Sequence, residues 1–234
     1  FLNKLSLTYY YLRDDDKALE MNLKCLSLRE KILGKKHPDY ATSLNNLAFI
    51  YDQLGEYDKA LEMNLECLAL KEKIFGKEHP DYALSLNNLA STYSELGDYD
   101  TALEMQLECH SLYEKIHDKE HPNYVLSLNN LAMTYSDLGD FDTALEMQLE
   151  CLALREKILG KEHPKYALSL INLASTYYDL GDYDKALKMQ LECLALREKI
   201  LGNEHPSYAS TLNNLARTYS ELRDYDKALE MNLE

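Results

Sequence analysis

The chain has 234 residues, 46% of them hydrophobic and 28% charged, so it can bury a core and is not a disordered acidic tail. Its 40 acidic and 25 basic residues give a net charge of −15, which repels phosphate groups, so we expect neither nucleic acid nor a membrane as a partner. No apolar stretch approaches the about 18 residues of a membrane-spanning helix, and no signal peptide opens the chain.

The sequence repeats itself every 42 residues, and both its His-Pro pairs and its cysteines follow this step. A fixed period of this length indicates an array of stacked supersecondary units rather than one globular domain. The copies are close, since residues 122–163 and 164–205 are identical at 33 of 42 positions. The recurring residues are His37, His79, His121, His163 and His205, and Cys25, Cys67, Cys109, Cys151 and Cys193.

We therefore predict a single repeat array over residues 1–234. Its parts are an incomplete first repeat at 1–37, full repeats at 38–79, 80–121, 122–163 and 164–205, and an incomplete last repeat at 206–234. Phe1 aligns with a position inside a first helix and Glu234 with one inside a second helix, so we expect open apolar ends that stack between molecules. Arg13 and Asp15 make the first repeat irregular, because they replace a glycine and a tyrosine.

Within residues 38–79, the pattern predicts two helices. Pro38 suits the first position of a helix, and Gly55 suits its end, because glycine adopts the left-handed conformation without penalty. Asp58 is expected to cap a second helix that ends at Gly76. Two apolar stripes on this second helix predict two partners, its own first helix and that of the next repeat. The stripes are Ala60, Met63, Cys67, Leu70 and Ile74, and Leu61, Leu65, Leu68 and Phe75.

The cysteines and histidines indicate structural roles. Equivalent cysteines of stacked hairpins lie roughly 10 Å apart, beyond the ~7 Å limit for a disulfide, so they fit small buried residues in a reducing, cytoplasmic compartment. No CxxC motif occurs, and we expect no metal and no cofactor. Each of the five recurring histidines precedes a proline between repeats, where a ring nitrogen can cap the following helix, although simple exposure is the alternative.

The repeat resembles a known family at specific residues. Leu47-Ala48, Tyr51, Gly55, Tyr57 and Ala60 follow the order of tetratricopeptide repeats, and the Asn-Asn-Leu-Ala segment and Gly-Lys-Glu-His-Pro linker resemble the 42-residue variety of kinesin light chains and nephrocystin-like proteins. The resemblance covers the whole chain. It implies an all-α fold, an α-solenoid of antiparallel helix hairpins wound as a right-handed superhelix, whose first helices line a concave groove.

The sequence favours binding over catalysis. No phosphate-binding loop, GxSxG or HExxH motif is present, and candidate acids recur only as columns on exposed helix faces, so we expect no enzyme. The resemblance places the following first-helix positions in the groove as a peptide-binding surface: Asn45, Asn46, Phe49, Asn87, Asn88, Ser91, Asn129, Asn130, Met133, Asn172, Asn213, Asn214 and Arg217. The asparagines can pair with the backbone of an extended peptide, or they can bond neighbouring turns and stabilise the stack.

At two columns beside the asparagines, the residue differs in almost every repeat. Positions that determine specificity would vary in this way, and surface positions under no constraint would vary in the same way. The two columns are Leu7, Phe49, Ser91, Met133, Ser175 and Arg217, and Tyr10, Asp52, Ser94, Ser136, Tyr178 and Ser220. An adjoining acidic column suggests a preference for basic or aromatic-basic segments: Tyr11, Gln53, Glu95, Asp137, Asp179 and Glu221. A further amide column on the second helices is expected to be structural: Asn22, Asn64, Gln106, Gln148, Gln190 and Asn232.

These observations lead to one functional hypothesis and one rival. The hypothesis is a cytoplasmic, non-enzymatic scaffold that binds an extended segment of another protein along its first helices. The rival is a structural spacer or self-associating array within a larger protein, which the near-identity of the repeats favours, since a selective groove usually needs more variation.

Overall fold

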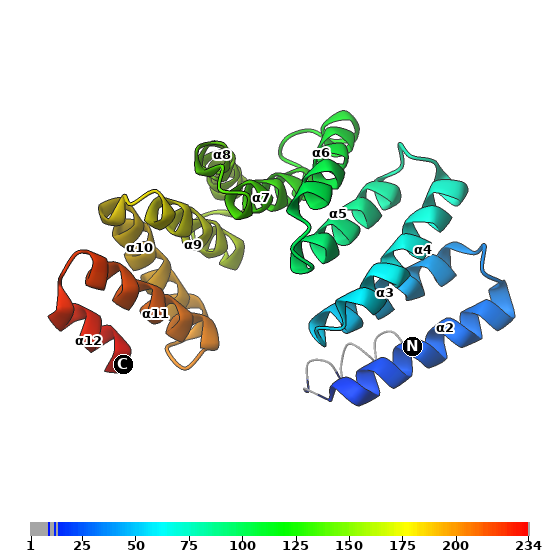
Figure 1. The fold of residues 1–234 in the computed structure, drawn as a ribbon, viewed down its shortest axis with the longest axis horizontal. Helices are drawn as coiled ribbons and strands as arrows, with labels where there is room; N and C mark the ends of the chain where they lie inside the picture. Colours follow the sequence, from blue (N-terminus) through cyan, green and yellow to red (C-terminus); the bar gives the residue numbers. More distant parts are fainter. Residues whose placement is uncertain (1–8, 10–11, 13, 234) are drawn as a thin grey trace. The chain divides into compact units, whose positions relative to one another are not determined.

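The computed structural model describes residues 9, 12 and 14–233, and over these residues the chain is helical without a strand. The predictions at Phe1, Leu7, Tyr10, Tyr11, Arg13 and Glu234 lie outside the described residues. The helices pack in consecutive antiparallel pairs within two compact units that divide after Ile116 (Figure 1). The predicted all-α solenoid fold of stacked hairpins is therefore confirmed.

The first unit contains α2 (Asp15–Leu33), α3 (Pro38–Gln53), α4 (Tyr57–Phe75), α5 (Pro80–Glu95) and α6 (Tyr99–Ile116). The second unit contains α7 (Pro122–Asp137), α8 (Phe141–Leu159), α9 (Pro164–Asp179), α10 (Tyr183–Leu201), α11 (Pro206–Glu221) and α12 (Tyr225–Leu233). The odd-numbered helices from α3 onward are the first helices of their repeats, and the even-numbered helices are the second ones.

Each first helix begins as the sequence predicts. Pro38 occupies the first turn of α3, and the Nδ1 atom of His37 accepts a hydrogen bond of 3.1 Å from the backbone N–H of Asp39. The same cap recurs at α5, α7, α9 and α11, which confirms the histidine caps. An accepting Nδ1 leaves the proton on Nε2, so the backbone fixes the tautomer of the ring.

The N-cap of α4 lies two residues before the predicted one, so the assignment of Asp58 as the N-cap is wrong. Asp58 lies in the first turn of α4, where its carboxylate favours the positive end of the helix dipole, and Glu56 holds the cap position. At that position in α8, Asp140 accepts from the N–H of Thr143 at 3.2 Å. The helix starts directly after the glycine turn, so the residue before the aromatic one becomes the cap.

The core of each repeat forms around a tyrosine and a cysteine. Tyr40, Ala41 and Leu44 of α3 pack against Cys67 of α4, whose thiol donates to the carbonyl of Ala41 at 3.3 Å. All five cysteines are unpaired and buried, which confirms their interpretation as small core residues. Burial raises the pKa of the Cys67 thiol, and it raises the pKa of the Cys109 thiol to about 12.

One part of the second-helix prediction fails. Leu65, assigned to a buried stripe, is 44% exposed, and its equivalents in the other repeats are exposed as well. Leu65 lies on the same side of α4 as exposed Glu62, Ala69 and Glu72, so neither neighbouring helix covers it. The amide column of the second helices is buried as expected, except for Asn232, which is exposed. Within this column, Asn64 donates to the hydroxyl of Thr92 at 3.0 Å.

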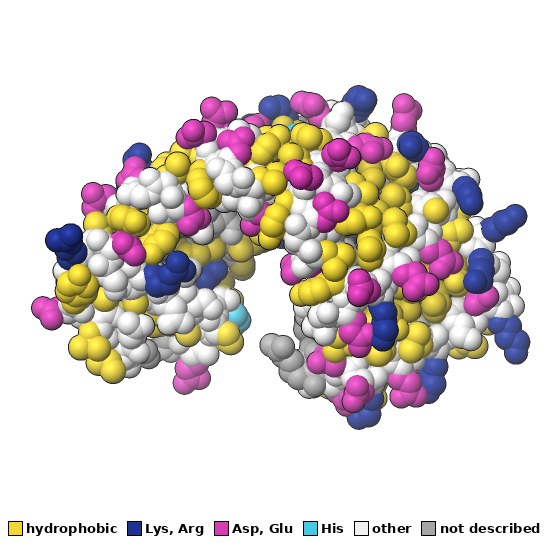
Figure 2. Space-filling model, viewed as in Figure 1, with side chains coloured by type: hydrophobic (Ala, Val, Ile, Leu, Met, Phe, Trp, Pro, Cys, Tyr) yellow, Lys and Arg dark blue, Asp and Glu magenta, His cyan; other side chains and the backbone are white. Residues whose placement is uncertain are grey.

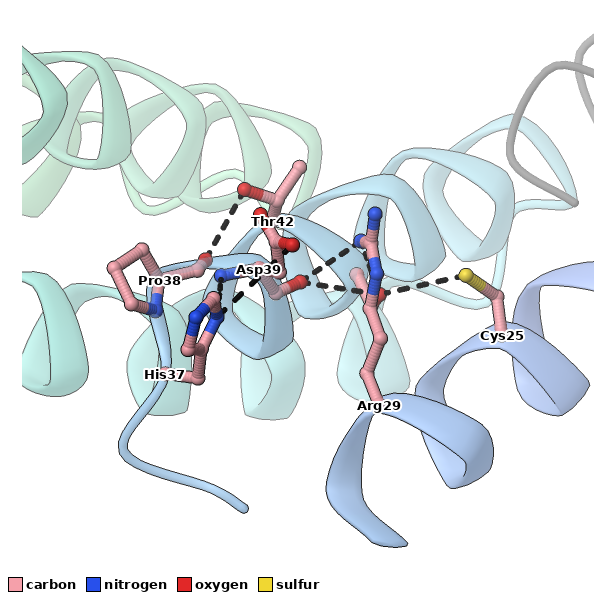
Figure 3. A network of polar contacts seen from close by, with 7 residues as sticks. Cys25, Arg29, His37, Pro38, Asp39 and Thr42 are labelled. Atoms are coloured by element: carbon pink, nitrogen blue, oxygen red, sulfur yellow. Dashed lines mark hydrogen bonds and ion pairs between the residues drawn. The ribbon is translucent and has the colours of Figure 1, made fainter. Parts of the chain in front are cut away.

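In three repeats, an arginine ties the second helix to the first helix of the next repeat, as Arg29 of α2 does (Figure 3). Arg29 donates from Nη1 to the carbonyl of Asp39 at 2.8 Å and to the hydroxyl of Ser43 at 2.7 Å, and the Cys25 thiol lies 3.8 Å from that hydroxyl. Arg155 and Arg197 make the same pairs of bonds in the second unit. These links hold successive first helices in register, and so they position the surface considered next.

Candidate functional site

In the first unit, the slot between α3 and α5 is a hollow of about 310 Å³. Exposed Phe49 and half-buried Asp52 come from α3, exposed Leu84 and Ser91 come from α5, and buried Asn64 of α4 closes the slot beneath them. Its walls also include Asn45, Asn46, Ala48, Asn88 and Thr92. An aromatic ring, an aliphatic side chain and several amides therefore share one slot.

The asparagines of neighbouring first helices bond to each other. Asn88 of α5 donates to the side-chain oxygen of Asn45 of α3, and in the second unit Asn172 of α9 donates to Asn129 of α7 at 3.3 Å. Ile171 interrupts the ladder between α9 and α11. An amide has two donors and an acceptor with two lone pairs, so one such bond leaves capacity for a ligand.

In the second unit, the hollow between α7 and α9 has a volume of about 430 Å³. Three basic residues line it, Arg155, His163 and Lys165, and no acidic residue does. The other lining side chains are mostly apolar or amides: Pro122, Val125, Leu126, Asn129, Asn130, Met133, Ile158, Leu159, Leu168 and Asn172. The equivalent position one repeat later, beside α10 and α11, holds a smaller hollow of about 200 Å³.

A fourth hollow, of about 140 Å³, lies between α9 and α11 and matches the α3–α5 slot of the first unit. Its lining consists of Ser175, Tyr178, Asp179, Gln190, Asn214 and Arg217. The guanidinium of Arg217 lies over the ring of Tyr178, 4.9 Å from its centroid. Tyr178 in turn donates from its hydroxyl to Glu221 at 3.2 Å.

The carboxyl groups at these slots are perturbed by burial. Desolvation raises the pKa of Asp52, and a weaker contribution of the same sign comes from the charge of Glu95. Desolvation likewise raises the pKa of Asp179, and the nearby charge of Arg217 lowers it in part. Gln53, Glu95 and Asp137, assigned to the same acidic column, are exposed, so the suggested preference for basic segments stays a prediction.

Most of the predicted site residues lie along these hollows. The α3–α5 slot brings together Asn45, Asn46, Phe49, Asn88 and Ser91, the α7–α9 hollow Asn129, Asn130, Met133 and Asn172, and the α9–α11 slot Asn214 and Arg217. Two predicted site residues line none of these hollows. Asn87 is buried, with only 8% of its surface exposed, and Asn213 is exposed to solvent.

Sequence reasoning missed the residues that come from outside the asparagine columns. Leu84, Leu126 and Leu168 are the same first-helix position in three repeats, and they are 36%, 40% and 43% exposed at the hollows. The sequence contained a signal for this position, because it changes character between repeats: it is leucine in these three repeats and polar in two others, at Thr42 and Ser210. The contribution of Arg155 had no comparable signal, since it depends on how two repeats pack.

Within residues 9, 12 and 14–233, the histidines, cysteines and carboxylates form no group of three that could hold a metal ion. No helix within these residues is long and apolar enough to cross a membrane. The surface that Figure 2 presents carries acidic and basic side chains interspersed with apolar ones, without a large field of one sign.

Comparisons with known proteins agree with the repeat pattern. The family profile described as Tetratricopeptide repeat matches residues 1–73, 65–115, 81–157, 124–199 and 167–234. No curated protein matches the sequence significantly.

Solved structures similar to the chain include a putative kinesin light chain with nearly identical TPR-like repeats from Podosopora anserina. It is 30% identical, with a TM-score of 0.71 over 83% of this chain and 92% of that chain. BtubC (BKLC) from P. vanneervenii is 23% identical, with a TM-score of 0.76 over 93% and 87% of the two chains. A Rap protein complexed with competence and sporulation factor is 13% identical, with a TM-score of 0.70 over 99% and 71%.

The profile therefore covers every repeat, and the similar structures share both the helix-hairpin unit and, in the Podosopora protein, the near-identity of its copies. From these matches and from the capped, stacked hairpins described above, the chain belongs to the tetratricopeptide repeat family.

Proposed function

We propose that this protein binds an extended segment of another protein along its first helices and has no catalytic activity of its own. The tetratricopeptide fold generally serves as a scaffold for protein interactions and is generally non-catalytic, and the similar Rap protein was solved as a complex with competence and sporulation factor. The buried, unpaired cysteines support a reducing, cytoplasmic location.

The observation that carries the proposal is the position of the variable residues. Phe49, Ser91, Met133, Ser175 and Arg217 occupy one first-helix position in successive repeats, and each lines a hollow beside half-buried asparagines. Constant amides can pair with the backbone of any extended segment, and changing side chains beside them can distinguish its residues. This arrangement fits a peptide that runs across successive first helices.

The test is a peptide array that samples basic, acidic and aromatic segments, followed by titration of the strongest binders. Replacing Asn88, Asn130 and Asn172 together with alanine is expected to weaken peptide binding at least about tenfold, since each lost hydrogen bond contributes about 1 kcal/mol. The matched control is Glu62→Ala with Glu104→Ala and Glu146→Ala, which removes exposed side chains from the second helices.

Two results would count against the proposal. If no peptide binds above background, the first helices hold no peptide. If the triple asparagine variant is destabilised to urea yet binds peptides as the original chain does, the asparagines serve the stack alone.

A second candidate is a self-associating array, and the last helix favours it. Leu229 of α12 is 59% exposed, whereas its equivalent Leu187 of α10 is half-buried and packs with Leu215 and Tyr219 of α11. In the preceding repeat, a first helix covers the equivalent apolar face. On α12 this face is exposed, and a second copy of the chain could pack against it. Light scattering over a concentration series tests this, with Leu229→Glu expected to abolish any growth in mass; a monomer at every concentration argues against it.

A further inference from the structure

The slot between α9 and α11 contains a buried amide whose oxygen has no hydrogen-bond partner. Gln190 of α10 is 3% exposed, and its Oε1 atom is buried without a donor. Burying an amide oxygen without a donor costs free energy, so such atoms are normally paired with protein, water or a ligand. Gln190 lines the slot, so a group that fills the slot lies next to its side chain.

The equivalent amide in the first unit is differently placed. Asn64 lines the α3–α5 slot, and its NH₂ group donates there to the hydroxyl of Thr92. Thr92 and the corresponding threonine of the α9–α11 slot, Thr218, each donate to a backbone carbonyl one turn earlier, at 3.2 Å and 3.1 Å, whereas the longer Gln190 remains unpaired at Oε1. The two slots share a position in the repeat but differ in the hydrogen-bonding capacity at the base.

The charges at the slot balance each other. Arg217 contributes a cation that is held over the ring of Tyr178, and Asp179 contributes a carboxyl group, and neither forms an ion pair among the residues that the structure describes. A charged ligand group meets a like charge at this slot, whereas an apolar group leaves Oε1 of Gln190 unpaired. A neutral group that both donates and accepts avoids both penalties.

We propose that this slot binds a carboxamide, the side chain of an asparagine or glutamine in the bound segment. Its NH₂ group donates to Oε1 of Gln190, and its carbonyl oxygen accepts from the guanidinium of Arg217 or the amide of Asn214. A carboxamide carries both donor and acceptor, so it pairs with Gln190 whichever way the glutamine amide is turned. The volume of about 140 Å³ is that of one side chain rather than of a peptide.

This inference rests on the proposed function, since it names one side chain of the segment that the first helices bind. The probes are three blocked residues that differ only in the side chain: N-acetyl-glutamine methylamide, N-acetyl-glutamate methylamide and N-acetyl-norleucine methylamide. Each is titrated into the isotopically labelled 234-residue chain, and nitrogen–proton correlation spectra report shifts of the Gln190 and Asn214 side-chain amides.

We expect saturable shifts with the glutamine compound and at least about tenfold weaker binding of the other two, because each leaves a buried group unpaired or opposes a charge. Gln190→Met keeps the length of the side chain and is expected to abolish the discrimination. Gln148→Met is the matched control, because Gln148 is the same position one repeat earlier and lines none of the hollows described above. Arg217→Ser, at an exposed site where two other repeats have serine, is expected to weaken binding several-fold without affecting the fold.

Equal binding of the three compounds, no shift at the slot, or unchanged glutamine binding in both Gln190→Met and Arg217→Ser would overturn the inference. The peptide array separates this failure from that of the proposed function. If peptides bind along the first helices while the glutamine compound leaves the slot unshifted, only the carboxamide site is wrong.

Discussion

The link made by Arg155 gives the sharpest test of how the repeats hold together. Its guanidinium is buried, 4% of the residue being exposed, and Nη1 donates to the carbonyl of Lys165 at 3.1 Å and to the hydroxyl of Ser169 at 2.7 Å. No ion pair involving Arg155 occurs among the described residues, and burial lowers the pKa of the guanidinium. Arg155→Ala removes the donor for both bonds and leaves a small cavity between α8 and α9.

The size of the effect follows from three opposing contributions. A hydrogen bond from a charged donor contributes about 1.5–3 kcal/mol, and relief of the desolvated charge offsets part of the loss of two such bonds. Ser169 can also donate to the carbonyl of Lys165, as Ser85 donates to Asp81 at 3.2 Å in the repeat where Lys71 replaces the arginine. We therefore expect Arg155→Ala to lower the free energy of unfolding of the second unit by about 2 kcal/mol.

The assay is urea unfolding followed by circular dichroism, combined with hydrogen exchange of the first turns of α9 and α11. Hydrogen exchange is needed because repeat arrays lose cooperativity when one interface is weakened. Arg155→Lys is expected to lose about half as much stability as Arg155→Ala. A lysine fits this position, since Lys71 is buried at the equivalent position of α4. Lys157→Ala, on the exposed side of the same helix, is expected to change stability by less than about 0.5 kcal/mol. An Arg155→Ala loss no larger than that of Lys157→Ala would refute the role assigned to this link.

Three further predictions concern local features. Gly160→Ala is expected to lower stability in thermal unfolding by about 1–3 kcal/mol, because Gly160 has φ +79° and ψ 164°, a region that only glycine adopts readily. Gly181→Asn is expected to lower stability by less, and equal losses in the two variants would contradict this reasoning. His163→Ala is expected to cost about 1 kcal/mol by loss of the cap of α9, and His163→Asn to restore most of it, so an unaffected alanine variant would exclude the capping role. Burial, with the charge of a nearby glutamate, raises the pKa of Tyr82 and Tyr166 to about 12, so their stabilisation is complete below about pH 10 and is lost between about pH 10 and 12. Burial also raises the pKa of Tyr113, so absorbance titration at high pH should show these three tyrosines ionising late, and their ionisation with the rest would contradict the burial.

The fold could be predicted from the sequence because its signals are local and repeated. Proline at the first turn, glycine after the second helix and apolar positions at helical spacing mark each hairpin without reference to any other part of the chain. The prediction failed at Asp58, where the tight glycine turn starts the helix two residues early, and at Leu65, where neither packing neighbour covers the side chain.

The candidate site was only half predictable for the opposite reason. The asparagine columns and the variable position beside them could be located from the repeat pattern, because one helix alone determines which face they occupy. Their environments could not: Asn87 is buried while its neighbour Asn88 lines a slot, since the packing of α5 against neighbouring helices decides which amide is covered.

By itself, the sequence determined the period, the helix hairpins, the burial of the cysteines and the face that carries the variable residues. The tertiary structure alone decided that Arg155 ties α8 to α9, that Asn64 finds a hydroxyl and that Oε1 of Gln190 does not. The physical reason is that these interactions join different helices. Nearly identical repeats can bring one or two different side chains to the same contact, and a single such change decides whether a buried polar atom is paired.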